Sequence, residues 1–198
     1  MNPRREQGWT IVETIVTVVV IGILIALALP LGPGGHPSKG AKTQMLSNMK
    51  RLHLATQLMA LDSTTTGDTN LGWPGDMGGS FSHWANALVK SNYLSAGDLC
   101  KLLSAPGKIA KPAPRAPVAN TNAVLVYAVR EESASESVFL TSANFTNTPT
   151  GGTALETSAK PFGNGGFVVF RKAGDGAILM AKQVGQTNVI GGYVPLLR

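Results

Sequence analysis

Cysteine is almost absent, because Cys100 is the only one among 198 residues. A single thiol forms neither an internal disulfide nor a multi-cysteine metal site. Its neighbours Leu99, Leu102 and Leu103 are apolar, so we expect Cys100 to be a small buried residue on a helix. The sequence therefore excludes a small disulfide-stabilised scaffold.

Motifs of known active sites are also missing. The chain has no His-Glu-x-x-His, paired-cysteine or nucleophile-elbow sequence. His36, His53 and His83 stand far apart, without neighbouring ligands at metal-site spacing. The glycine-rich residues 163–166 precede a predicted strand, whereas a phosphate-binding loop precedes a helix. We therefore expect no enzyme, and no catalytic residue, metal ligand or cofactor.

Acidic residues are fewer than basic ones, which gives a formal net charge of +6. Such an excess can attract nucleic acid or acidic surfaces. The Lys and Arg residues, however, are scattered from Arg4 to Arg198, and no run exceeds two. This distribution favours a solvated basic surface, and nucleic acid is not expected as a partner.

The N-terminal region contains the longest apolar stretch. Residues 14–38 carry no charge, and residues 18–29 have no polar side chain. A helix over residues 9–29 would be about 31 Å long at ~1.5 Å per residue, close to the ~30 Å hydrocarbon core of a bilayer. In lipid the backbone must satisfy its own hydrogen bonds, which favours a helix there. The sequence therefore predicts a transmembrane helix.

Two interpretations explain this stretch. In the first it is a secretory signal whose basic region is Arg4 and Arg5. Cleavage after Ala28 would then leave a soluble secreted or periplasmic binding protein. In the second it is a retained helix behind a short basic leader. Glu13 separates the two, because a carboxylate costs free energy in an apolar segment. It is either a tolerated interfacial residue or the future partner of an amino group on another subunit.

A membrane-anchored hydrolase is a third hypothesis for the whole chain. It is disfavoured, since no catalytic motif is present.

Residues 8–13 read GWTIVE, follow Arg4 and Arg5, and precede the apolar run. This segment resembles the prepilin signature of type IV pilins and type II secretion pseudopilins. The resemblance implies that a prepilin peptidase cuts after Gly8 and methylates Trp9, and that Glu13 becomes the fifth residue of the mature chain. Trp9 departs from the commoner phenylalanine but keeps an aromatic ring at this position.

The same resemblance implies a function, partners and a location. The chain is expected to be a structural subunit of a type II secretion pseudopilus or a type IV pilus-like filament. Its partners would be the prepilin peptidase, other pilin or pseudopilin subunits, an inner-membrane assembly platform and membrane lipid. It would cross the inner membrane once, with its N-terminus cytoplasmic and its head periplasmic, and would be periplasmic or extracellular in a filament.

The chain is expected to divide into four parts. A leader spans residues 1–8, the transmembrane and assembly helix spans 9–30, and a globular head spans 41–198. Residues 31–40 read LGPGGHPSKG, and this proline- and glycine-rich sequence predicts a helix break. The break departs from the resembled family, in which the N-terminal helix usually continues as a long rod.

The head begins with a predicted amphipathic helix over residues 39–62. Its apolar stripe contains Met45, Met49, Leu52, Thr56 and Met59, with Leu46, Leu58 and Leu61 widening it. The opposite side of this helix is expected to face solvent and to carry Lys42, Lys50 and Arg51.

Two short helices are predicted next, over residues 82–92 and 95–104, and a long loop over 146–164. Strands are predicted over residues 123–130, 137–141, 166–172 and 177–184, the last two joined by a hairpin at 173–176. Helices first and strands last predict an α+β fold in which the amphipathic helix packs on a C-terminal antiparallel sheet.

Overall fold

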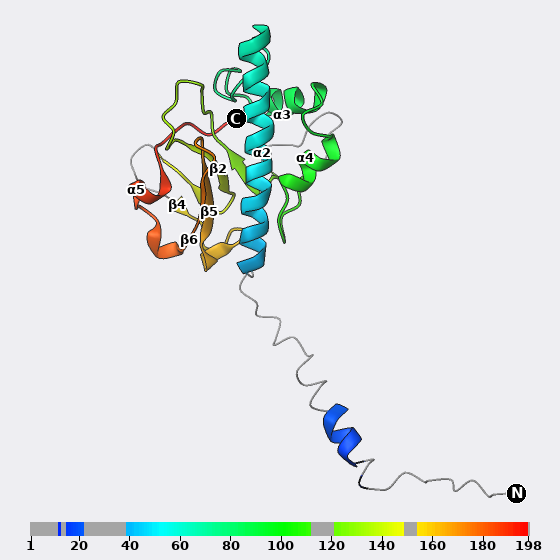
Figure 1. Cartoon of the computed structure of the whole chain (residues 1–198). Coiled ribbons are helices and arrows are strands. Elements are labelled where there is room, and N and C mark those ends of the chain that lie inside the picture. Colours follow the sequence, from blue (N-terminus) through cyan, green and yellow to red (C-terminus); the bar gives the residue numbers. More distant parts are fainter. Residues whose placement is uncertain (1–11, 13–14, 22–38, 112–120, 149–153, 198) are drawn as a thin grey trace, which may run out of the picture. The chain divides into compact units, whose positions relative to one another are not determined.

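The computed structural model describes residue 12 and residues 15–21, 39–111, 121–148 and 154–197. The chain divides into two compact units, Met1–Gly35 and His36–Arg198. In the first unit, Val12 and residues 15–21 are helical. The second unit, which we call the head, contains every other element described below (Figure 1).

The head begins with α2 (Lys39–Thr66), which starts where the sequence predicts and continues beyond the predicted end at residue 62. The added turn contains three threonines. The hydroxyls of Thr64 and Thr65 donate to the carbonyl of Leu61, and that of Thr66 donates to the carbonyl of Asp62. These are bonds that threonine side chains make to carbonyls within a helix. The helix ends just before Gly67, whose amide donates to the carbonyl of Ser63 at 2.8 Å and whose φ is 72°.

The buried stripe of α2 is confirmed. Its members are the predicted side chains Met45, Met49, Leu52, Thr56 and Met59. At about 1.5–3 kcal/mol for each large apolar side chain removed from water, this stripe holds α2 on the rest of the head.

Three residues of α2 do not lie where the sequence analysis placed them. Leu58 and Leu61 were expected to widen the stripe but are exposed. Lys42 was expected in solvent but is buried, because its ammonium group donates to the carbonyl of Gly165 and lies 5.9 Å from the ring centroid of Phe162. A lysine stem packs on apolar groups while its charged end finds an acceptor.

Two short helices follow, α3 (Phe81–Lys90) and α4 (Ala96–Leu102), close to their predicted positions. Trp84 and Leu88 of α3 are buried on one face, as predicted. Ser95 caps α4 by accepting a hydrogen bond from the amide of Asp98 at 3.0 Å. Cys100 is on this helix but is only half-buried, so its predicted full burial is wrong.

The main sheet is antiparallel throughout, with the strand order β1-β2-β5-β6. Its strands are β1 (Val124–Val126), β2 (Val138–Ser142), β5 (Phe167–Arg171) and β6 (Gly176–Leu179). All four lie within or beside the predicted ranges. The last is shorter than predicted, because a 3-10 turn, η3 (Ala181–Gln183), follows it.

Smaller elements complete the head. A two-stranded sheet of β3 (Phe145–Thr146) and β4 (Ala154–Leu155) occupies part of the predicted loop over residues 146–164. The remaining elements are η2 (Gly163–Gly165) and α5 (Thr187–Ile190).

The hairpin between β5 and β6 is confirmed, with a different turn from the one that the Asp-Gly sequence favours. The amide of Arg171 donates to the carbonyl of Asp175 at 2.9 Å, and Gly174 takes the left-handed conformation with φ 89°. Gly174 lies against the ring of His53, where an added Cβ would stand 3.2 Å from Cε1. The turn is therefore shaped by its contact with α2.

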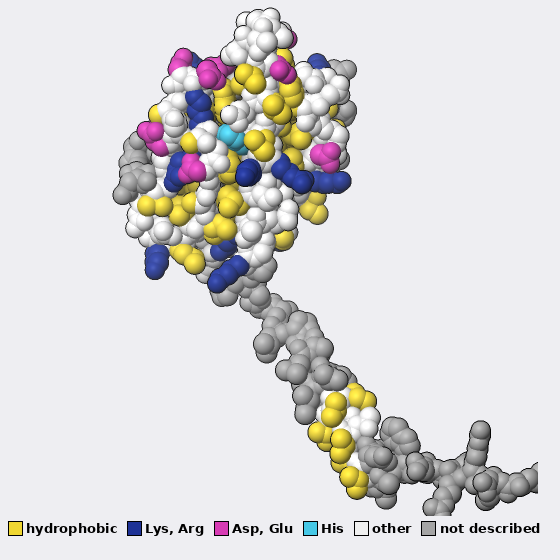
Figure 2. All heavy atoms as spheres, viewed as in Figure 1, with side chains coloured by type: hydrophobic (Ala, Val, Ile, Leu, Met, Phe, Trp, Pro, Cys, Tyr) yellow, Lys and Arg dark blue, Asp and Glu magenta, His cyan; other side chains and the backbone are white. Residues whose placement is uncertain are grey.

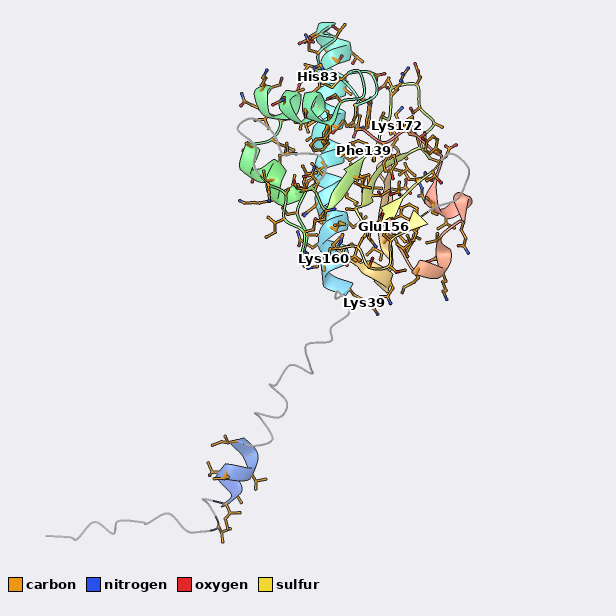
Figure 3. The ribbon with its side chains drawn as sticks, turned by 180° about the vertical axis from the view of Figure 1, so that it is seen from behind. Lys39, His83, Phe139, Glu156, Lys160 and Lys172 are labelled. Atoms are coloured by element: carbon orange, nitrogen blue, oxygen red, sulfur yellow. The ribbon has the colours of Figure 1, made fainter. Side chains whose placement is uncertain are left out.

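The predicted α+β class is confirmed for the head. In Figure 1, α2 runs between the sheet on one flank and the short helices α3 and α4 on the other. Figure 3 shows the reverse side, with Phe139 of β2 beside α2 and His83 at the end of the head opposite Lys39. The core therefore lies on both flanks of α2.

The predicted transmembrane helix and the predicted break fall largely outside the described residues. Among the residues that are described, no helix is both long and apolar enough to cross a membrane. Lys39 and Gly40, which the sequence analysis placed in the break, are in the first turn of α2.

Candidate functional site

The three residues predicted to act in processing and assembly are Gly8, Trp9 and Glu13. All three lie outside the described residues.

The described helix of the first unit has apolar side chains on all sides, and Thr17 is the one polar residue among those described there. The exposed fractions of Val12, Ile15, Val16 and the apolar residues 18–21 run from 48% to 68%. A helix that is hydrophobic all round is normally covered by protein or lipid. This segment therefore presents a surface that another molecule must cover.

A second exposed apolar surface lies on α2 of the head. Leu54, Leu58 and Leu61 have exposed fractions of 48%, 56% and 59%. At about 100° per residue, these three leucines lie about 180° from the buried stripe. They form a second apolar stripe on the opposite face, which we call the leucine ridge.

The ridge was readable in the sequence. Leu54, Leu58 and Leu61 follow the spacing i, i+4, i+7, as an apolar helix face does. Leu58 and Leu61 were expected to widen the buried stripe, but at about 100° per residue they lie on the opposite face. Apolar residues on both faces of one helix indicate that both faces have neighbours.

A groove of about 760 Å³ runs beside the ridge, between α2 and the segment that contains α4. Leu54, Ala55 and Leu58 line its α2 side, and Leu94 and Leu102 line the other. Figure 2 shows apolar side chains gathered along α2, with Lys and Arg side chains beside them.

Charged side chains line part of this groove. Arg51 comes from α2, and Lys101 and Asp98 come from α4, where Lys101 Nζ lies 3.8 Å from Asp98 Oδ1. Both partners of that ion pair are exposed, so it adds little stability. Arg51 has no ion pair among those the described residues form, which leaves the groove with a net positive charge.

Tyr93 joins the groove to the C-terminal part of α2. Its hydroxyl donates to a carboxylate oxygen of Asp62. Burial and then the neighbouring Asp62 carboxylate raise the pKa of Tyr93 to about 12, so it stays protonated and keeps donating at neutral pH. The contact helps to fix one wall of the groove.

His53 fixes the other flank of α2. Its ring is buried, and Nε2 donates to the carbonyl oxygen of Lys172 at 2.7 Å. Burial lowers the pKa of His53, and the hydrogen bond to Lys172 opposes part of that shift. The exposed ridge is therefore held on a helix that is anchored to the sheet.

These features suit binding to a partner. The groove combines apolar walls with a charged rim, an arrangement typical of protein contact surfaces. No three His, Cys, Asp or Glu side chains of the described ranges gather as metal ligands. The described surface thus offers contacts to a partner through α2.

Comparison with known proteins gives one similarity. Over 70 residues, which are 35% of this chain, the sequence is 27% identical to the type IV major fimbrial protein FimA of Dichelobacter nodosus. The chain resembles a type IV pilin. The match covers 44% of that fimbrial protein, so the pilin-like chain spans less than half the length of this relative. No family model matches the chain, and no solved structure does.

Proposed function

We propose that this chain is a structural subunit of a type IV pilus-like filament or a type II secretion pseudopilus, and that it is not an enzyme. In this proposal the prepilin peptidase cuts between Gly8 and Trp9 and methylates the new amino terminus. The apolar helix then holds the subunit in the inner membrane, with the head in the periplasm, until an assembly platform moves it into a filament.

The proposal rests mainly on one observation, the order of two helices in one chain. An exposed helical segment, apolar except for Thr17, precedes α2, and α2 packs its own buried stripe on an antiparallel sheet. The first suits lipid or a bundle of like helices, and the second suits a rigid head. The prepilin-like GWTIVE sequence and the similarity to a fimbrial protein support the same function.

Glu13 has a defined role in this proposal. A carboxylate and an amine are each costly alone in a low-dielectric core, and pairing offsets part of that cost. In the filament Glu13 pairs with the amino terminus of Trp9 in a neighbouring subunit.

The intact mass of the mature chain tests the proposal. In cells that contain the prepilin peptidase, we expect a chain that begins at Trp9 and carries one added methyl group. A peptidase-deficient strain is the control and should retain the leader. A mature chain beginning at Leu29 would refute the proposal and support the secreted binding protein.

A further inference from the structure

The end of the head at which α2 begins carries a group of lysines. Figure 3 shows Lys39, the first residue of α2, and Lys160 at this end, with His83 at the opposite end. Lys39, Lys160 and Lys182 are exposed, and none of them belongs to an ion pair formed by the described residues. We call these three lysines, together with the half-buried Lys108, the lysine base.

Contacts between distant segments bring these lysines to one end. The ammonium group of Lys42, in the first turn of α2, donates to the carbonyl of Gly165, so the loop that carries Lys160 lies beside that turn. The side chain of Lys160 lies against Gly107, where an added Cβ would stand 2.9 Å from Lys160 Cδ. Lys108 follows Gly107 in the chain and therefore belongs to the same end.

The fourth lysine comes from the turn after β6. Gly166, which directly follows the glycine that accepts from Lys42, borders the end of this strand. An added Cβ at Gly166 would stand 2.2 Å from the carbonyl oxygen of Leu179 and 3.3 Å from Cα of Met180. The end of β6 is therefore close to the first turn of α2, and Lys182 follows in η3.

The lysine base carries a net positive charge. The segments that meet there are residues 39–50, 104–111, 154–166 and 176–184. Their one acidic residue is Glu156, whose carboxylate interacts with the charge of Lys108. In Figure 2, the end of the head from which the chain leaves shows Lys and Arg side chains and, on the face drawn there, no Asp or Glu side chain. An excess of cations at one end gives that end a positive potential.

The far end of the head has the opposite charge. The acidic residues of this end are Asp62, Asp68, Asp76, Glu131 and Glu132. Asp76 and Glu131 line one hollow together with the last turns of α2. Arg130 pairs with Glu132 at 3.5 Å. Lys172 donates to the backbone carbonyl of Glu131, and the carboxylates still outnumber these two cations. An anionic surface therefore attracts the lysine base and repels the far end.

Two large apolar side chains project among the lysines. Ile109, next to Lys108, is 76% exposed, the largest value among the large apolar residues described. Met180, two residues before Lys182, is 52% exposed. Exposed apolar side chains flanked by lysines are typical of surfaces that rest on lipid, because the ammonium groups meet phosphates while the apolar groups enter the headgroup region.

The lysine base is also the part of the head closest along the chain to the apolar segment, because residues 22–38 join that segment to Lys39. We propose that the lysine base lies on the anionic phospholipid headgroups of the membrane that holds the apolar segment. Ile109 and Met180 enter the headgroup region, and the acidic far end is turned away from the lipid. The inference rests on the proposed function, since it needs the apolar segment in a membrane. The tether raises the effective concentration of the base at the surface, so a weak contact suffices.

Fluorescence quenching in vesicles tests the contact with the purified full-length chain. Cys100→Ser removes the native thiol, and a thiol-reactive fluorophore is attached at Ile109→Cys or, at the far end, at His83→Cys. The vesicles contain phosphatidylcholine alone or an equal mixture with phosphatidylglycerol, and a lipid with a spin-labelled headgroup serves as the quencher. In the anionic vesicles we expect at least about threefold more quenching at Ile109→Cys than at His83→Cys.

Salt and charge variants show whether the attraction is electrostatic. Raising NaCl from about 0.1 M to about 1 M shortens the Debye length from ~10 Å to ~3 Å and should remove most of the quenching at Ile109→Cys. Lys160→Glu and Lys182→Glu should each reduce it at least about twofold. The matched control is Lys90→Glu, which makes the same change in net charge at an exposed position on α3 and should leave the quenching unchanged.

Equal quenching at Ile109→Cys and His83→Cys, or equal quenching in neutral and anionic vesicles, would overturn the contact with lipid. A fluorescence change at Ile109→Cys that follows the protein-to-lipid ratio would show that the base contacts a second copy instead. Flotation of the same vesicles separates this inference from the proposed function. A chain that floats with the vesicles but shows no quenching refutes the contact and retains the function, whereas a chain that floats with neither kind of vesicle refutes the membrane helix on which the function depends.

Discussion

His53 on α2 and Lys172 in the β5–β6 hairpin are joined by a hydrogen bond of 2.7 Å between the ring Nε2 and a backbone carbonyl oxygen. The imidazole also lies among the rings of Trp73, Phe139 and Phe170, with centroid distances of 5.7, 6.0 and 5.3 Å. A neutral imidazole ring can form this hydrogen bond and all of these aromatic contacts. A protonated ring adds a buried positive charge close to the lysine.

This burial predicts that the head loses stability as the pH falls. The pKa of His53 is lowered in the folded state, so the unfolded chain binds the proton first, near its ordinary pKa of about 6.5. The stabilisation that the neutral His53 ring gives the folded head is complete above a pH of about 6.5. It is lost as the pH falls toward the pKa of His53 in the folded state. Thermal unfolding of the full chain in detergent, from about pH 8 to about pH 5, should show a decline that His53→Gln reduces.

The control for this experiment is His83→Gln, because His83 is exposed on α3. It should leave the dependence on pH unchanged. His53→Gln itself should lower the midpoint at high pH, since an aromatic contact is lost, while it flattens the profile. Parallel profiles for the parent chain and His53→Gln would show that His53 does not contribute to the dependence on pH.

A buried hydroxyl on α2 provides the second prediction. Trp84 Nε1 donates to Thr56 Oγ1 at 3.2 Å, and both side chains are fully buried. Thr56→Val keeps the shape but leaves the indole N–H without its acceptor, which should cost about 1–3 kcal/mol in the free energy of unfolding. Thr56→Ser keeps the acceptor and loses only a methyl group, for about 1 kcal/mol. Denaturant unfolding measures both, and an equal loss in the two variants would contradict the role of the hydrogen bond.

Gly166 provides the third prediction, because it has no room for a side chain. Its φ is 104°, and an added Cβ would stand 2.2 Å from the carbonyl oxygen of Leu179 in β6. Gly166→Ala should therefore cost at least about 2 kcal/mol of unfolding free energy by forcing β5 from β6. Gly97→Ala is the matched control: this glycine is within α4 and has space, so the change should stabilise the head by about 0.5–1 kcal/mol. A Gly166→Ala variant as stable as the parent would contradict the close contact.

Glu13 provides the fourth prediction, which separates assembly from membrane insertion. Glu13→Ala makes the apolar segment more apolar, so membrane fractionation should find at least as much protein in the membrane as for the parent. Filament yield should fall strongly when the variant is the sole copy, because the amino terminus of a neighbouring subunit loses its partner. Glu13→Gln, which keeps the size and removes the charge, should behave like Glu13→Ala. Unchanged filament yield from either variant would leave Glu13 as an interfacial residue without a role in assembly.

Periodicity and turn chemistry predict much of the head from sequence. The stripe from Met45 to Met59 identifies α2 because apolar residues recur at helical spacing, and this signal depends on no distant residue. The strands of the main sheet and the hairpin follow from β-branched runs separated by a glycine-rich turn. The order of helices and strands then gives the α+β class.

The errors arise where distant segments meet. Lys42 is buried because the carbonyl of Gly165 and the ring of Phe162 lie beside it, and both are more than a hundred residues away in sequence. Leu58 is exposed because the groove separates α4 from that side of α2. The burial of Lys42 does not follow from the local pattern, since that pattern gives the angle of a side chain around its helix and not the neighbour at that angle. The position of Leu58 opposite the buried stripe does follow from its angle.

The sequence by itself therefore determined the apolar N-terminal segment, the prepilin-like GWTIVE motif and the elements of the head, because each depends on residues that are close together in the chain. Only the tertiary structure decided which face of α2 is covered and how the groove beside the leucine ridge is lined. That groove is assembled from residues as far apart as Gln44 and Ala105, and only the packing of the whole head brings such residues together.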